Sequence, residues 1–81
     1  MIDIKLENIE VKKYELMREW CRENFGQGAW WKNQLTHPDS TITWYSNSNY
    51  TKNHGVPEET GIVHFYFKND KDSTMFMLRW G

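Results

Sequence analysis

Residues 2–26, IDIKLENIEVKKYELMREWCRENFG, contain the change of pattern that decides the fold. The first six of these residues alternate strictly between apolar and charged, which predicts a half-buried β-strand. From Ile9 to Phe25 the apolar residues recur every three or four positions, which predicts an amphipathic helix. A strand followed almost directly by a helix is therefore expected at the start of the chain.

The predicted helix has one broad apolar face and a second, narrower apolar stripe. The broad face consists of Val11, Tyr14, Met17, Cys21 and Phe25. The stripe consists of Leu16 and Trp20, one turn apart. Such a helix either sits in a deep groove or contacts something beyond its own sheet. Asn8 is the expected N-cap, and Gly26 is the expected glycine after the last turn.

The middle of the chain is expected to hold a long connection and then a strand. Within residues 26–40 we expect a short helical turn at Ala29–Leu35 that places Trp30 or Trp31 in the core. The composition of Thr41–Tyr45 is typical of a strand, which the polar residues that follow could extend to Tyr50.

The last third of the sequence predicts a second hairpin strand and a closing helix. Thr60–Phe67 alternates, with Val63, Phe65 and Phe67 on one face and Ile62, His64 and Tyr66 on the other. Residues 53–57 carry the turn chemistry of the hairpin. Thr74–Trp80 has helical spacing, and Asp70 or Asp72 is the expected cap.

The predicted order is β-α-β-β-α in a single α+β domain, residues 1–81. Three strands with two helices on one face form a two-layer sandwich, which is a truncated ferredoxin-like arrangement. A right-handed crossover through the first helix would make the first strand and one hairpin strand parallel neighbours.

Charge and composition exclude several classes of function. The formal net charge of −1 disfavours a strong nucleic-acid binder, which needs a basic face. We expect no membrane span, because there is no apolar stretch of 18 residues, and no signal peptide. A single cysteine, Cys21, excludes an internal disulfide and fits a reducing cytoplasm.

Catalytic, metal and cofactor sites are not expected. Cys21 belongs to the buried helix face, where a thiol behaves as a small apolar group. The three histidines, His37, His54 and His64, lack the short spacing of metal ligands. The close glycines Gly26 and Gly28 follow a helix, whereas a phosphate loop follows a strand.

Aromatic residues are abundant for so short a chain: five Trp, four Tyr and four Phe. Those on predicted inward faces build the core, and the others are candidate contact residues: Trp20, Trp30, Trp31, Tyr45, Tyr50 and Tyr66, with His64 beside Tyr66. Interfaces between proteins are enriched in Trp and Tyr. An alternative is single-stranded nucleic acid stacked on Tyr45 and Tyr66 of the outer sheet face, and a further one is that all rings serve the fold or a homodimer.

The C-terminal stretch FYFKNDKD, residues 65–72, followed by MFMLRWG, residues 75–81, resembles the ends of short uncharacterised proteins of tailed phages, including T4-like phages of marine bacteria. The likeness covers about a quarter of the chain. It implies a phage origin and a host-cell cytoplasmic setting, and it carries no assigned activity. The sequence thus predicts a non-enzymatic interaction module that associates with itself or binds a host or phage protein.

Overall fold

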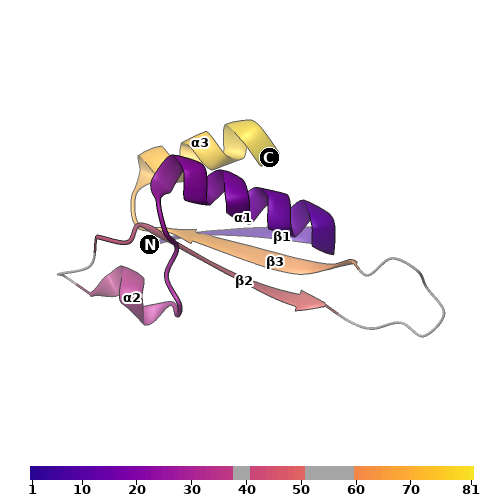
Figure 1. The fold of residues 1–81 in the computed structure, drawn as a ribbon, viewed down its shortest axis with the longest axis horizontal. Coiled ribbons are helices and arrows are strands. Elements are labelled where there is room, and N and C mark those ends of the chain that lie inside the picture. The colour runs from indigo at the N-terminus through magenta and orange to yellow at the C-terminus, as the bar shows by residue number, and fades with distance from the viewer. Residues whose placement is uncertain (38–40, 51–59) are drawn as a thin grey trace.

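The computed structural model describes residues 1–37, 41–50 and 60–81, which form three strands and three helices (Figure 1). The elements are β1 (Ile2–Glu10), α1 (Val11–Phe25), α2 (Asn33–Thr36), β2 (Trp44–Tyr50), β3 (Thr60–Phe67) and α3 (Asp70–Trp80). Apart from the short α2, the order is the β-α-β-β-α order that the sequence predicts, and the fold is α+β. The predicted hairpin turn at residues 53–57 lies outside the described residues.

The three strands form one antiparallel sheet in the order β1-β3-β2. Both outer strands are antiparallel to β3, so β1 and β2 run parallel to each other with β3 between them. The prediction that β1 and a hairpin strand are parallel neighbours is therefore wrong. The crossover through α1 places β2 one strand away from β1, and β3 returns through the hairpin into the space between them.

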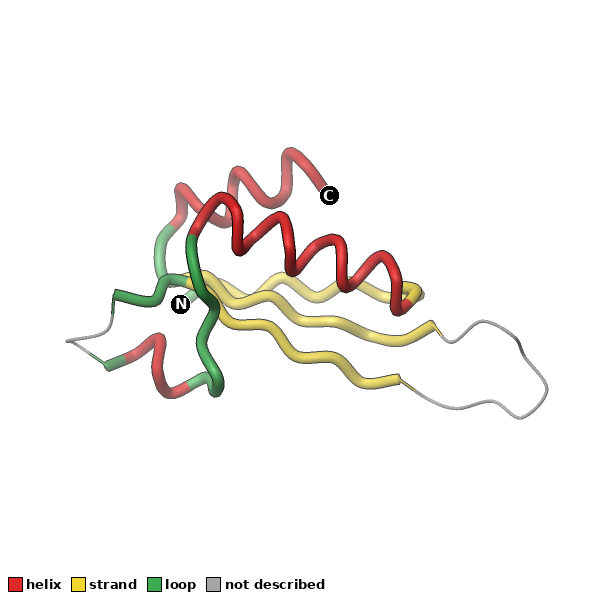
Figure 2. Tube along the Cα trace, in the orientation of Figure 1, coloured by secondary structure: helices red, strands yellow, loops and turns green. Residues whose placement is uncertain are grey.

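Helices α1 and α3 cover one face of the sheet, as predicted, whereas α2 lies near the start of β2 (Figures 1 and 2). Buried side chains fill the space between the two helices and this inner face. The fully buried ones include Phe65, Phe67, Phe76, Met17 and Val63, with Cys21 beside them. Phe76 of α3 packs on Phe65 and Phe67 with ring centroids 4.6 and 5.3 Å apart.

The start of α1 differs from the prediction. Asn8 is not the N-cap, because β1 continues to Glu10 and the helix begins at Val11. Between Leu6 and Ile9 the pairing with β3 shifts register, and Asn8 has a positive φ of 58°. Asparagine tolerates this left-handed conformation better than most residues, so it suits a β-bulge. Val11, predicted to be buried, is exposed at the first turn.

The other end of α1 follows the prediction. Gly26 follows the last helical residue with a φ of 85°, and its N–H donates to the carbonyl of Arg22. A positive φ favours glycine at this position. The chain can therefore turn sharply from α1 toward the edge of β2.

The connection after α1 also differs from the prediction. Its helical turn is α2, which starts four residues later than expected, and Leu35 is the side chain that is buried there. Trp30 and Trp31, one of which was expected in the core, are 73% and 57% exposed. A leucine thus takes the apolar position, and both indoles remain on the surface.

Helix α3 begins earlier than predicted, with a different cap. The side chain of Asn69 accepts a hydrogen bond of 3.0 Å from the backbone N–H of Asp72, so neither Asp70 nor Asp72 is the cap. Both aspartates lie in the first turn, where negative charge complements the helix dipole.

Candidate interaction surface

The outer face of the sheet carries two neighbouring rows of side chains. In one row Tyr66 of β3 lies between Tyr45 of β2 and Asp3 of β1. In the next row His64 lies between Asn47 and Lys5. Strict alternation along β3 sends Phe65 and Phe67 into the core, so His64 and Tyr66 must point outward. This placement of Tyr45, His64 and Tyr66 agrees with the sequence.

Three of these side chains pack face to face, and we call Tyr45, Tyr66 and His64 the ring row. The Tyr45 and Tyr66 rings have centroids 5.8 Å apart and an angle of 26°. His64 and Tyr66 also have centroids 5.8 Å apart, at an angle of 11°. Such spacing lies in the favourable range for aromatic pairs. All three rings remain half-buried, so part of each is available for contact.

Charged groups lie at both sides of the ring row. Nδ1 of His64 lies 3.0 Å from Oδ1 of Asp3. Nζ of Lys32, from the segment before α2, lies 4.7 Å from the centroid of the Tyr66 ring. This distance permits a cation–π interaction, worth roughly 0.5–1 kcal/mol at an exposed site. Both contacts hold the rings in place and give the surface one acid and one base.

Trp30 and Trp31 lie on the segment that runs along β2 toward this surface. The backbone N–H of Ala29 donates to the carbonyl of Trp44 over 2.9 Å, which attaches the segment to β2. Lys32, only three residues later, already reaches Tyr66 on the outer face. Between these two residues, Trp30 lies toward the helix side of β2, where it borders a pocket with Arg18 and Arg22 of α1. Trp31 is the exposed residue next to Lys32.

The other two predicted contact residues, Trp20 and Tyr50, lie elsewhere. Trp20 is half-buried between α1 and α3, with its ring edge-on to Phe25 and Trp80 at 5.4 and 6.5 Å. Tyr50 packs toward the inner face, with its ring 6.2 Å from that of Tyr14. The structure thus gathers three of the seven candidates, Tyr45, His64 and Tyr66, on the outer face. It exposes Trp30 and Trp31 on the segment next to the start of β2 and uses Trp20 and Tyr50 within the fold.

Two contacts of this surface are absent from the sequence prediction. Asp3 was recognised as an outward residue of the first strand, but its contact with His64 depends on the pairing of β1 with β3. The position of Lys32 depends on the path of the connection, for which the sequence carries no periodic signal. Antiparallel pairing of the two strands would have been the clue for Asp3.

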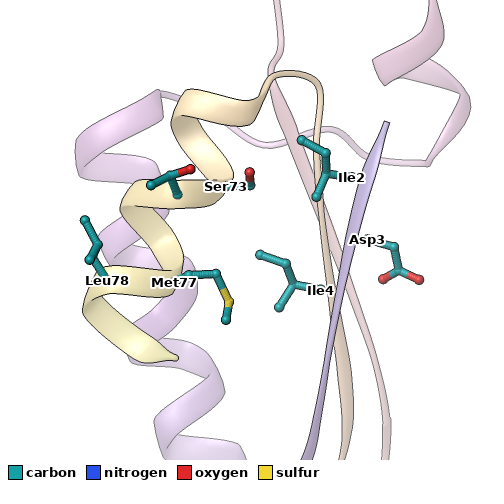
Figure 3. A pocket seen from close by; sticks show the side chains of 7 residues that line it. Ile2, Asp3, Ile4, Ser73, Met77 and Leu78 are labelled. Carbon is teal, nitrogen blue, oxygen red and sulfur yellow. The ribbon is translucent and has the colours of Figure 1, made fainter.

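A second surface feature is an apolar groove between β1 and α3 (Figure 3). Ile2 and Ile4 point from the strand toward Met77 of the helix, whereas Asp3 points away. The other residues that line the groove are Ser73, Thr74 and Leu78. Leu78 is 84% exposed, and Met77 is also exposed. The sequence argument did not identify this groove.

The chemistry of a nucleophilic or metal site is not seen in the described residues. Burial raises the pKa of the Cys21 thiol to about 12, and the nearby charge of Asp72 acts in the same direction. Cys21 is therefore protonated at neutral pH as well as buried. Within residues 1–37, 41–50 and 60–81, no three His, Cys, Asp or Glu side chains are grouped closely enough to hold a metal ion. Nor does any helix in these ranges have the length and apolar character needed to span a membrane.

Compared with models of protein families, with curated proteins and with solved structures, the chain matches none. The likeness of residues 65–81 to phage proteins therefore stays a prediction. The function is therefore inferred from the surface of the protein.

Proposed function

We propose that the protein is a non-enzymatic interaction module that binds another protein through an aromatic surface. We define this aromatic surface as Trp30, Trp31, Lys32, Tyr45, His64 and Tyr66. The observation that carries the proposal is the exposure of two adjacent tryptophans directly before Lys32, the residue that lies over the Tyr66 ring of the ring row. Tryptophan and tyrosine dominate the energetic centres of protein interfaces, because they bury a large area with few rotatable bonds.

The charges around the rings support a protein partner over a nucleic acid. Asp3 lies beside His64, and Lys5 is paired with Glu7 at 3.5 Å. Acids therefore offset the bases near the rings, whereas a phosphate backbone requires an uncompensated basic frame. A surface with few net charges and several rings suits the mixed apolar and polar chemistry of a protein partner.

Single-stranded nucleic acid remains the second candidate because of one specific arrangement. Tyr66 and His64 occupy outward positions of the central strand, and Lys32 lies over the Tyr66 ring. Proteins that bind single strands combine such rings with nearby cations. We rank this candidate second because Asp3 lies in the same row as Tyr66.

We also infer the finer class of the fold and the setting of the protein. The antiparallel β1-β3-β2 order supports a ferredoxin-like arrangement that lacks its final strand. The resemblance of residues 65–81 supports a phage origin, and with it the cytoplasm of the host cell.

A selection from a random peptide library, followed by NMR mapping, tests the proposal. Peptides that bind should shift the indole N–H signals of Trp30 and Trp31 and the ring signals of Tyr66. The double variant Trp30→Ser/Trp31→Ser should lose peptide binding by about tenfold or more, the scale of a truncated interface hot spot. Because both indoles are largely exposed, the variant should keep its fold.

Leu16→Ser is the matched control, because Leu16 lies on α1 and its exposed fraction, 56%, is nearly the same as the 57% of Trp31. It should leave peptide binding unchanged. Peptides that map to other surfaces would contradict the proposal.

Titration with a single-stranded oligonucleotide at low salt tests the second candidate, which is binding of a single-stranded nucleic acid. Binding that is lost in Tyr45→Ala/Tyr66→Ala would favour it.

A further inference from the structure

Strand β1 has one open side in the described structure. Its pairing partner is β3, on one side, and no other described strand pairs with it. Backbone N–H and C=O groups on an open strand side can pair with another chain. The apolar groove between Ile2, Ile4 and Met77 lies directly beside this strand.

The residues of β1 are complementary to a second copy of themselves. In an antiparallel pair with a two-fold axis at Ile4, Ile4 lies opposite its own copy and Ile2 lies opposite Leu6. On the outer face, Asp3 then lies opposite Lys5, and Lys5 lies opposite Asp3 of the second copy. Opposite charges directly across two strands are stabilising. The pairing thus places apolar against apolar on one face and acid against base on the other.

Other registers are less complementary. A two-fold axis at Asp3 places two aspartates opposite each other, and an axis at Lys5 places two lysines opposite each other. An axis at Leu6 would place Lys5 opposite Glu7, but it would also place Ile2 opposite Glu10 and Ile4 opposite Asn8, and it would extend across the bulge at Asn8. Like charges and a bulge both disfavour pairing. The axis at Ile4 is therefore selected.

The helix layer is consistent with the same arrangement. α3 lies on the β1 side of the molecule, where Met77 and Leu78 expose apolar surface along the groove. The two-fold axis at Ile4 brings the two grooves together, so each α3 can cover apolar surface of the other copy. Exposed apolar patches of this kind mark interaction sites.

We propose that a second copy of this chain pairs with β1 in the register centred on Ile4. The two three-stranded sheets then join into one continuous sheet, with all major helices on the same face. The dimer surface differs from the aromatic surface, and Asp3 is the residue near both. The inference therefore does not depend on the proposed function.

Sedimentation of charge variants tests the pairing. Lys5→Asp makes positions 3 and 5 both acidic, and Asp3→Lys makes them both basic. Each single variant places two like-charge pairs across the axis. We expect each to raise the dimer dissociation constant by about tenfold or more. Lys13→Asp, an exposed change of the same charge on α1, is the control and should leave dimerisation unchanged.

An equimolar mixture of Lys5→Asp and Asp3→Lys gives the decisive result. In the mixed pair each acidic position faces a basic one, so a heterodimer should form with an affinity close to that of the unmodified protein. A fold defect in the single variants could not be repaired by mixing. A mixture that stays monomeric while the unmodified protein dimerises would overturn the pairing.

Cysteine cross-linking tests the register. Directly opposed residues have Cα atoms about 4.5–5.5 Å apart, within the range of a disulfide. Ile4→Cys should therefore form an intermolecular disulfide under mild oxidation by air. The two copies of Ile2→Cys would lie about 14 Å apart and should not cross-link. An unmodified protein that is monomeric at all concentrations, or equal cross-linking at both positions, would overturn the proposal.

Discussion

The two edges of the sheet differ in what lies beside them. At the β2 edge, Ala29 pairs with the carbonyl of Trp44, and the Trp44 indole N–H donates to the carbonyl of Gly26 over 2.8 Å. The segment after α1 thus covers the start of this edge, at Trp44. At the β1 edge the described structure shows an apolar groove and a strand with alternating charges.

The difference shows two ways in which a protein can limit the pairing of an edge strand with other chains. An open edge invites pairing with other chains, and covering it with a loop prevents this. Alternating charges do not prevent pairing, but they restrict it to registers in which acids face bases. The β2 edge is covered at its start by the chain itself, and at the β1 edge we expect the charges to select the register of a partner strand.

The largest effect is expected from removing Trp44, the side chain at the covered start of β2. Trp44 is buried, stacks on Phe65 at 6.4 Å and bonds Gly26. Trp44→Ala should lower the free energy of unfolding by about 3–5 kcal/mol, measured by urea denaturation. Trp31→Ala should change it by less than about 0.5 kcal/mol, because Trp31 is exposed. Equal losses in the two variants would contradict the role of Trp44.

Alkaline pH should weaken the core that both edges share. The unfolded Cys21 thiol ionises above its ordinary pKa of 9.0, whereas the folded thiol has a pKa of about 12. The folded state therefore binds more protons between these values, and its stability falls as pH rises, by about 1.4 kcal/mol per pH unit.

The pKa of Tyr50 is also raised, chiefly by burial and then by Tyr14 and Glu15, and it adds a loss in the same direction above its ordinary value of 10.0. Cys21→Ala is the control for the alkaline effect, because it removes the thiol contribution and leaves that of Tyr50. Denaturation at a series of pH values from 8 to 11 should give a shallower loss in the variant. An identical slope in both proteins would show that Cys21 does not contribute.

A smaller effect is expected where the covering segment contacts the edge. A Cβ on Gly28 would lie 2.8 Å from Cζ2 of Trp44, closer than real contacts allow. Gly28→Ala should therefore displace the indole and cost about 1–3 kcal/mol of stability. Gln27→Ala, at the next residue, should be nearly neutral. Thermal unfolding of the two variants distinguishes local overpacking from a general effect of the segment.

The smallest effect is expected at the bulge that limits the open edge. Asn8→Ala places a residue with a Cβ and without the asparagine amide at a φ of 58°, which should cost about 1 kcal/mol. Asn8→Gly should be neutral or slightly stabilising, since glycine adopts this φ without strain. A difference of the opposite sign in urea denaturation would show that φ does not decide the choice of residue here.

Much of the fold follows from local patterns. The alternation in β1 and β3, and the helical spacing from Tyr14 to Cys21, place the correct side chains on the inner face. The first residues of α1 and α3 were harder to predict, because Asn8 and Asp70 are both residue types that favour the N-cap position. The bulge and Asn69 decide where the helices begin.

The candidate surfaces were only partly predictable. The outward positions of His64 and Tyr66 follow from the alternation of side chains along β3. The outward position of Tyr45 follows from its pairing opposite Tyr66. The exposure of Trp30 depends on Leu35 taking the buried position after it. The groove between β1 and α3 depends on which strand lies at the edge, which no local pattern encodes.

Local patterns establish which side chains share a face, because the period of a strand or helix is a property of consecutive residues. Which elements are neighbours depends instead on the packing of the whole chain. This packing places β3 between β1 and β2, brings Lys32 over Tyr66, and leaves the charged strand with one side on which no other described strand pairs. These outcomes depend on contacts between residues far apart in the chain, and such contacts are set by packing as a whole.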